Sequence, residues 1–320
     1  AADLAHHAAL AGESALAARA CVRAGRLFLR QFANAEAWST ARRGRYHVAE
    51  VKEPERTSLL LELLQVELQA RRPADVAAAS AELEALAERA LDHGDAEHAR
   101  LGFHMLSYLR WEEGDLSDAQ RHMMRAEVVS RAADERAQVV AMAEAARCLV
   151  LLERDLPRAE ALALEASARS SRLGLRPSAI ADAQGMLRQH QGSLAEAAEL
   201  FEESRLEARR EGDAMGEFQA LEHQVVLRQQ QGDWAGARRL AVELDALGGK
   251  LREGSEAPFA RALLALSRHA LGEAGAEDAL EAALEELRRA DAKLRLAYAL
   301  TRAARLDLEG SRPDRARARA

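Results

Sequence analysis

Turn-forming residues recur along the whole chain at a step of roughly 20 residues, and this rhythm limits the possible folds more than any other feature. Between the turns, apolar residues follow the i, i+3, i+4, i+7 spacing of an amphipathic helix. The pattern predicts a long series of short helices. The turn signals lie near Gly12, Asn34, Pro54, Pro73, Gly94, Gly114, Asp134, Asp155, Gly174, Gly192, Gly212, Gly232, Gly254, Gly272, Asp291 and Gly310.

The composition agrees with an all-α fold. Ala, Leu, Glu and Arg dominate, and each of them is a strong helix former. Aromatic residues make up only 4% of the 320 residues, which leaves too few strand-favouring side chains for a sheet protein. The near absence of Lys beside many Arg is typical of a GC-rich coding bias, and we expect a bacterial source.

The chemistry of the turns favours a helix–turn–helix arrangement. A glycine can adopt the left-handed conformation that closes a helix, and a following Asp or Ser can cap the next one. All six prolines lie in turns or in first helical turns, where they are tolerated. The shared glycine-plus-polar design occurs at Gly12-Glu13, Gly94-Asp95, Gly114-Asp115, Gly192-Ser193, Gly212-Asp213, Gly232-Asp233, Gly272-Glu273 and Gly310-Ser311.

Every second turn belongs to one series, and this series defines the repeat. Its anchors, spaced by 40, 38, 40, 40 and 38 residues, are Gly114, Arg154, Gly192, Gly232, Gly272 and Gly310. Five positions after an anchor an alanine recurs, and five before it a leucine, at Ala119, Ala159, Ala197 and Ala237 and at Leu109, Leu149, Leu187 and Leu227. A small residue lets the second helix approach the first, and the leucine column is expected to be buried.

One such helix pair cannot bury its apolar stripe alone, so the pairs must stack. We therefore predict a right-handed superhelical α-solenoid of about eight pairs of ~40 residues, spanning 1–320 as a single domain. Residues 1–53 form less regular helices, 54–310 form the regular pairs, and 311–320 begin a truncated repeat. Both ends look cut, which suggests a piece of a larger protein.

The segments Gln231–Ala237 and Glu113–Ala119 resemble the G-D-x-x-x-A turn of tetratricopeptide (TPR) repeats. The units here are longer than the 34 residues of that family, and its early aromatic and terminal Pro are mostly missing. Such long repeats resemble the C-terminal arms of bacterial MalT-like and AAA-type signal-transduction ATPases. The segments Leu4–His7, Ala11–Glu13 and Phe32–Ala37 resemble the region that follows the ATPase module there.

The charge, apolar runs and motifs argue against several function classes. A net charge of −7 and a pI near 5.9 oppose general nucleic-acid binding, and no apolar run is long enough to span a membrane. Gly248-Gly249-Lys250 lacks the other residues of a phosphate loop. His93, His98 and His104 do not have the spacing of helical zinc ligands. We expect no catalysis, cofactor or metal, and a reducing, cytoplasmic environment for Cys21 and Cys148.

An arginine column is the strongest candidate binding feature. Arg110, Arg188, Arg228 and Arg268 each precede an anchor glycine by four residues, and Val150 interrupts the column. In one interpretation each Arg complements the dipole of its helix and pairs with a neighbouring Glu. In the other, the column and its neighbours Trp111, Gln189, Gln229 and His269 line the concave face and recognise an acidic or extended peptide through forked Arg contacts.

Trp111 is the best single anchor candidate, because it lies in the segment richest in aromatics, while Phe103 and Leu106 are expected in the core. The alternative is a tryptophan packed between repeats, which we also expect of Trp234. Trp38 lies in the less regular N-terminal part and carries little information.

Architecture and missing motifs together indicate a non-catalytic protein-interaction or regulatory scaffold. The resemblance to MalT-like and AAA-type ATPases implies that this scaffold is the sensor or oligomerisation arm of a multidomain bacterial signalling protein. The partner would be a protein or peptide, the protein's own ATPase or effector domain, or a second copy in a homo-oligomer. The alternative is the small-molecule or peptide receptor arm of a transcription regulator, as the resemblance to MalT-like proteins implies.

Overall fold

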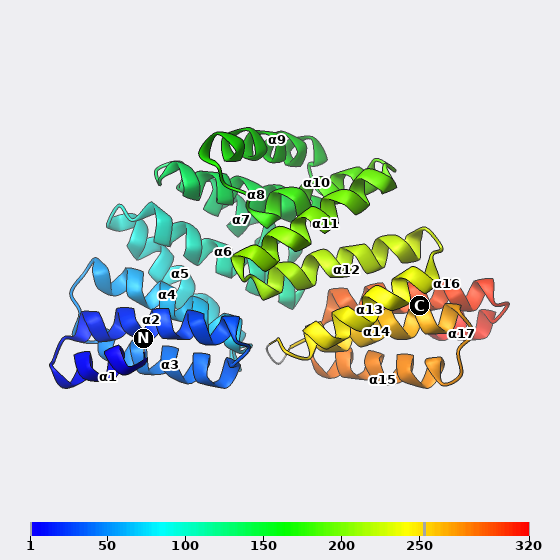
Figure 1. Ribbon diagram of the computed structural model, residues 1–320, viewed down its shortest axis with the longest axis horizontal. Helices are drawn as coiled ribbons and strands as arrows, with labels where there is room; N and C mark the ends of the chain where they lie inside the picture. The colour runs from blue at the N-terminus through cyan, green and yellow to red at the C-terminus, as the bar shows by residue number, and fades with distance from the viewer. Residues whose placement is uncertain (1, 252–253, 320) are drawn as a thin grey trace. The chain divides into compact units, whose positions relative to one another are not determined.

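The computed structural model describes residues 2–251 and 254–319, and all regular secondary structure in these ranges is α-helical. The predicted α-solenoid is confirmed, and each predicted turn falls between two consecutive helices or at the boundary of one (Figure 1). The helices are α1 (Ala2–Leu10), α2 (Ser14–Arg30), α3 (Asn34–Val48), α4 (Glu55–Ala70), α5 (Val76–Asp92), α6 (Ala96–Glu113), α7 (Leu116–Ser130), α8 (Glu135–Leu151), α9 (Leu156–Leu173), α10 (Ser178–His190), α11 (Leu194–Glu211), α12 (Ala214–Gln230), α13 (Trp234–Gly248), α14 (Glu256–Ala270), α15 (Ala276–Arg289), α16 (Lys293–Glu309) and α17 (Pro313–Arg319).

The helices pair as the anchor series predicts, with α1 preceding the pairs that run from α2/α3 to α16/α17. First helices of successive pairs also contact one another, as α2 does α4 and α14 does both α12 and α16. At these places packing runs along the first helices as well as within the pairs. The contacts group into two compact units, which are described separately below. Unit 1 is Ala1–Trp111 with Asp115–Ala183, and unit 2 is Glu112–Gly114 with Gln184–Ala320.

Both predicted columns lie in the interior. The four alanines after the anchors are at most 1% exposed, and the four leucines before them are at most 4% exposed. An alanine at each site brings the second helix close to the first, and a leucine fills the space between a first helix and its neighbours. The repeat is thus a packing unit as well as a sequence pattern.

The turns follow the expected chemistry with two differences. Asp115, Asp213 and Asp233 accept hydrogen bonds from backbone N–H groups in the first turns of α7, α12 and α13, whereas Ser193 makes no side-chain cap bond. Seven of the eight turn glycines have positive φ, but Gly310 has φ −80° and Ser311 takes the left-handed conformation instead. No helix among the described residues is long and apolar enough to cross a membrane.

Candidate functional site

One side of α6, in unit 1, carries polar and aromatic side chains at helical spacing. Its opposite side is core, because Phe103 and Leu106 are almost fully buried. Three residues of α8 extend this half-exposed surface beside α6. We call the set the α6–α8 strip, which consists of Arg100, His104, Tyr108 and Trp111 on α6 and Glu144, Arg147 and Leu151 on α8.

A shared carboxylate holds the two helices of the strip together. The Arg100 Nη1 donates to Glu144 Oε2 at 3.1 Å, and His104 Nδ1 lies 3.0 Å from the same oxygen. Burial alone would raise the pKa of the Glu144 carboxyl, but His104, Arg100 and Arg147 outweigh it and lower that pKa to about 2. Glu144 is therefore ionised at neutral pH and holds Arg100 and His104, whose side chains are 13% and 24% exposed.

An aromatic pair forms the other end of the strip. The rings of Tyr108 and Trp111 stack with centroids 6.1 Å apart and planes 25° apart. Both side chains are half-buried, so they offer apolar area without a large ordering cost on binding. Leu151, which is 46% exposed, adds an apolar side chain on α8. The strip thus combines fixed charge with apolar area that a ligand could cover.

Replacing Glu144 by glutamine is expected to lower the free energy of unfolding at pH 7 by roughly 2–3 kcal/mol. The lowered pKa of Glu144 contributes stability above the unfolded-state pKa, and this contribution is lost as pH falls toward about 2. The difference between wild type and variant, measured by urea denaturation, should therefore shrink between pH 5 and pH 2. Glu165→Gln, at a half-exposed site, is the control and should show a much smaller difference throughout. A pH-independent effect of Glu144→Gln would contradict this account.

The arginines of the sequence-predicted column each pair with an acidic residue of their own repeat. Arg110 Nε lies 3.7 Å from Asp118, Arg188 Nε lies 3.1 Å from Glu196, Arg228 Nη1 lies 3.6 Å from Asp233, and Arg268 Nε lies 3.0 Å from Glu273. Each pair joins the end of a first helix to the turn or helix that follows. Solvent-accessible pairs of this kind contribute about 0–1 kcal/mol, so the guanidinium groups of Arg188, Arg228 and Arg268 can exchange partners at little cost. Arg110 differs, because its Nε atom is buried.

The neighbours of the column have more varied environments. Gln189 donates to Gln230 at 2.8 Å near the surface. Gln229 is only 2% exposed and donates to the carbonyl of Leu263 at 3.0 Å and to Ser267 Oγ at 2.9 Å. These hydrogen bonds link α12 to α14 inside unit 2 and satisfy a polar group that is buried away from water. The buried Gln229 side chain therefore offers little accessible surface to a ligand.

Arg228 and Gln229 are adjacent in sequence but should respond differently to truncation. We expect Arg228→Ala to change the free energy of unfolding by less than about 1 kcal/mol, since its ion pair is exposed. Gln229→Ala should cost about 1–3 kcal/mol, because it leaves Ser267 and the Leu263 carbonyl without this donor. Urea denaturation of the two variants measures the difference. Equal costs would show that the Gln229 contacts do not stabilise the fold.

His269, the last column neighbour, belongs to a buried polar cluster of unit 2. Its Nε2 lies 2.7 Å from Arg312 Nη2 and 3.9 Å from Asp307, which also pairs with Arg312 and Arg319 at 3.1 Å. Burial and the nearby Arg312 charge lower the pKa of His269. The cluster ties α17 to α14 and α16, so His269 has a structural environment.

A second buried cluster connects α12, α14 and α16. Arg295 Nη1 donates to Glu256 at 3.0 Å and to Ser255 at 2.6 Å, and its Nη2 lies 3.4 Å from Glu222. The guanidinium also lies over the ring of Phe259, 5.4 Å from its centroid. These contacts satisfy charges that have left water, which is the condition under which buried charges are tolerated.

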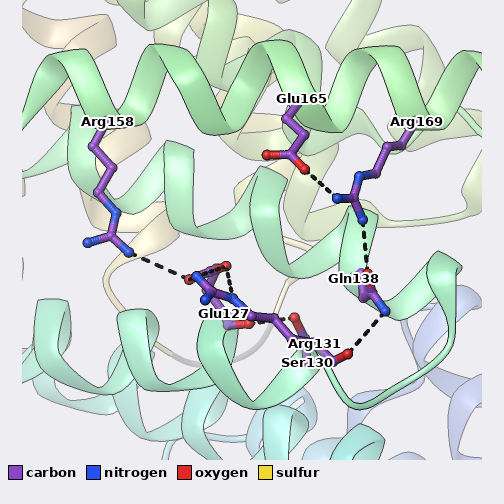
Figure 2. Close-up of polar contacts among 7 residues, drawn as sticks. All are labelled: Glu127, Ser130, Arg131, Gln138, Arg158, Glu165 and Arg169. Atoms are coloured by element: carbon purple, nitrogen blue, oxygen red, sulfur yellow. Dashed lines mark hydrogen bonds and ion pairs between the residues drawn. The ribbon is translucent and has the colours of Figure 1, made fainter.

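On the second-helix side of unit 1, a polar cluster joins α7, α8 and α9 (Figure 2). Glu127 receives two nitrogens of Arg131 at 3.0–3.1 Å, and Arg158 of α9 lies 3.6 Å away. Figure 2 shows Arg169 reaching from α9 to Gln138, a contact of 2.9 Å. The donors and acceptors face one another across the helices, and this arrangement is typical of a stabilising contact between neighbouring pairs.

The described residues contain no group of three or more His, Cys, Asp or Glu that could hold a metal ion. Both cysteines are free, and burial raises the pKa of each thiol, that of Cys148 to about 11. A thiol with a raised pKa is a poor nucleophile at neutral pH. Neither cysteine therefore has the environment of a reactive residue.

Trp111 is the only sequence-predicted candidate that the structure brings into the strip. Arg100, His104, Tyr108 and Glu144 are not among the binding residues that the sequence predicts. The sequence does contain a signal for a polar surface on the first helices, because a histidine or an acidic residue stands ten residues before each of four successive anchors. This polar column on first helices is His104, Glu144, Asp182 and Glu222.

Comparison with known proteins supports the fold alone. No protein-family model matches the sequence, and no curated protein matches it. Among solved structures, the chain is similar to a Rap protein complexed with competence and sporulation factor, with a TM-score of 0.59, 11% identity, and coverage of 95% of this chain and 96% of that one. Aspartyl phosphate phosphatase F from Bacillus subtilis aligns with a TM-score of 0.47, 12% identity and coverage of 95% and 92%. The first likeness supports a TPR-like helical repeat.

Proposed function

We propose that this chain is a non-catalytic interaction scaffold that binds an extended peptide segment of a partner protein along the α6–α8 strip. The observation that carries the proposal is the combination, on two adjacent first helices, of a stacked Tyr108–Trp111 pair with basic side chains fixed by Glu144. Aromatic residues and arginines are the side chains that dominate the energetics of protein interfaces. The fixed positions of Arg100 and His104 reduce the entropy lost on binding.

The chemistry of the strip favours a peptide with acidic and apolar side chains. Arg147 lies near Glu144 but on the half-exposed side of α8, where a carboxylate of the ligand can reach it. Tyr108, Trp111 and Leu151 offer surface for an aliphatic or aromatic side chain. In unit 1, Arg110 stands beside Trp111 at the end of the strip and is a further candidate contact. Within unit 2, Arg188, Arg228 and Arg268 form a separate set of candidate contacts, which would exchange their acidic partners for those of a ligand. A similar fold is present in a Rap protein that is complexed with competence and sporulation factor, and this likeness supports a binding role for the present chain.

We further propose that the scaffold is the cytoplasmic sensor or oligomerisation arm of a multidomain bacterial signalling protein, as in MalT-like regulators. Its partner would then be an effector or ATPase domain of the same protein, another protein, or a second copy. The alternative, a receptor arm for a small molecule, is favoured by the aromatic pair, which could stack on a planar or sugar ligand.

Binding of an extended peptide library by fluorescence anisotropy tests the proposed function. Peptides with acidic and aromatic residues should bind the wild type, and Trp111→Ala should weaken that binding about 30-fold or more, as expected of an interface hot spot. Leu164→Ala, at a 56% exposed site on α9, is the control and should leave the affinity unchanged. Equal binding by the wild type and Trp111→Ala would contradict the proposed site.

A thermal-shift screen separates the two ligand classes. A ligand that binds only the folded protein raises its melting temperature. If sugars or nucleotides produce a shift that Trp111→Ala abolishes, while no peptide does so, the small-molecule alternative replaces the peptide scaffold.

A further inference from the structure

Two arginines converge on one tryptophan in the N-terminal part of unit 1. Trp38, in α3, packs on the core through part of its side chain and remains half-exposed. The guanidinium carbons of Arg42 and Arg71 each lie 5.6 Å from the centroid of its indole ring. Cation–π attraction therefore holds two positive charges beside a single aromatic surface.

The backbone explains why the two side chains meet. Arg42 follows Trp38 by one helical turn of α3 and shares its face. Arg71 caps the end of α4 in an extended conformation, and its N–H donates to the Glu67 carbonyl at 2.9 Å. A fixed helix end thus presents Arg71 to the ring from the neighbouring helix.

The charges of Arg42 and Arg71 are only partly balanced by nearby carboxylates. Both side chains are exposed, and Arg42 lies close enough to Glu67 to favour the ionised form of that carboxyl. The hydrogen bond to Glu67 is made by Arg45, whose Nη1 donates to it at 3.3 Å, and Arg45 also pairs with Glu82. Arg42, Arg45 and Arg71 thus outnumber these two carboxylates beside Trp38.

From this geometry we infer a second binding site, formed by Trp38, Arg42 and Arg71, for a dianionic phosphoryl group. Two forked guanidinium groups offer more donors than one carboxylate can accept, whereas a phosphate monoester presents three acceptor oxygens and up to two negative charges. The indole covers one side of the bound group and strengthens its charge-assisted hydrogen bonds by excluding water. The site uses residues outside the α6–α8 strip, so its test is independent of the test of the proposed peptide function.

Titration of Trp38 fluorescence tests the site directly. In a chain carrying Trp111→Phe and Trp234→Phe, Trp38 is the remaining tryptophan. The probes are inorganic phosphate, a Gly-Gly-phosphoserine-Gly-Gly peptide, and the same peptide with serine, all at constant ionic strength. We expect saturable fluorescence changes with phosphate or the phosphopeptide and none with the serine peptide.

Matched variants identify the arginines that act. Arg42→Ala and Arg71→Ala should each weaken phosphate binding at least about tenfold. Arg239→Ala, which removes an exposed charge on α13, should leave it unchanged. Far-UV circular dichroism verifies the fold of each variant, which these exposed substitutions are not expected to disturb.

The probes also distinguish the source of the phosphoryl group. Tighter binding of the phosphopeptide than of inorganic phosphate supports a phosphorylated protein segment as ligand, and the reverse order supports a free phosphate compound. Either result upholds the site if it requires both arginines. Absence of saturable binding, or wild-type affinity in Arg42→Ala and Arg71→Ala, would overturn it.

Discussion

Replacing Arg295 by alanine is expected to lower the free energy of unfolding by about 3–5 kcal/mol. The substitution removes the guanidinium that donates to Glu256, whose side chain is fully buried, and to Ser255. Glu222 loses its contact with Arg295 Nη2, at 3.4 Å, at the same time. A buried carboxylate without its counter-ion either stays charged in a poorly polarisable interior or takes up a proton, and both responses cost free energy.

Two further variants separate charge from packing in this cluster. Arg289→Ala removes an exposed arginine of α15 and should change the stability by less than about 1 kcal/mol. The double variant Arg295→Met, Glu256→Gln keeps most of the volume and removes both charges, so it should recover part of the loss. Urea denaturation measures all three. A cost below about 1 kcal/mol for Arg295→Ala would show that water reaches Glu256 and that the cluster does not hold α12, α14 and α16 together.

Replacing Leu149 by alanine should cost about 2–5 kcal/mol of unfolding free energy. Leu149 belongs to the leucine column and is only 1% exposed, so its truncation leaves a cavity between helices that cannot fully collapse. In a solenoid each pair is stabilised mainly by its neighbours, so the damage should be concentrated in the pairs around α8. Hydrogen exchange should therefore accelerate most in α7, α8 and α9.

The same helix supplies the control for this prediction. Leu151 lies two residues further along α8 and is 46% exposed. Leu151→Ala should therefore cost less than about 1 kcal/mol. Similar costs for the two truncations would contradict the assignment of Leu149 to a buried column.

The helices and their pairing could be predicted from the sequence because both depend on local and periodic signals. Gly114, Gly192 and Gly232 end helices in a conformation that favours glycine, and Ala159 and Ala197 mark close approaches between helices. These residues act within one repeat, so their spacing alone reveals their role. Gly310 is the exception among the turn glycines, because Ser311 takes the left-handed conformation in its place. Nothing in the sequence pattern distinguishes this turn from the others.

The polar sites were less predictable because they depend on residues from different helices. The environment of His104 is decided by Glu144, which lies forty positions later and on another helix. Gln229 stands next to the arginine column, a position that suggests exposure, yet its amide donates to Ser267 in the interior. One position in a repeat fixes the helix face only approximately, and the neighbouring side chains decide which atoms reach the surface.

Site-specific photo-crosslinking tests the central claim, that the chain acts by binding a partner along the α6–α8 strip, most directly. A photoreactive phenylalanine derivative is placed at Tyr108 in the strip or at Leu164 on α9, and the protein is irradiated in cells that produce it naturally. We predict a discrete crosslink to a protein partner from position 108, reduced by Trp111→Ala, and none from position 164. Absence of a crosslink at position 108, or equal crosslinking from both positions, would contradict the account.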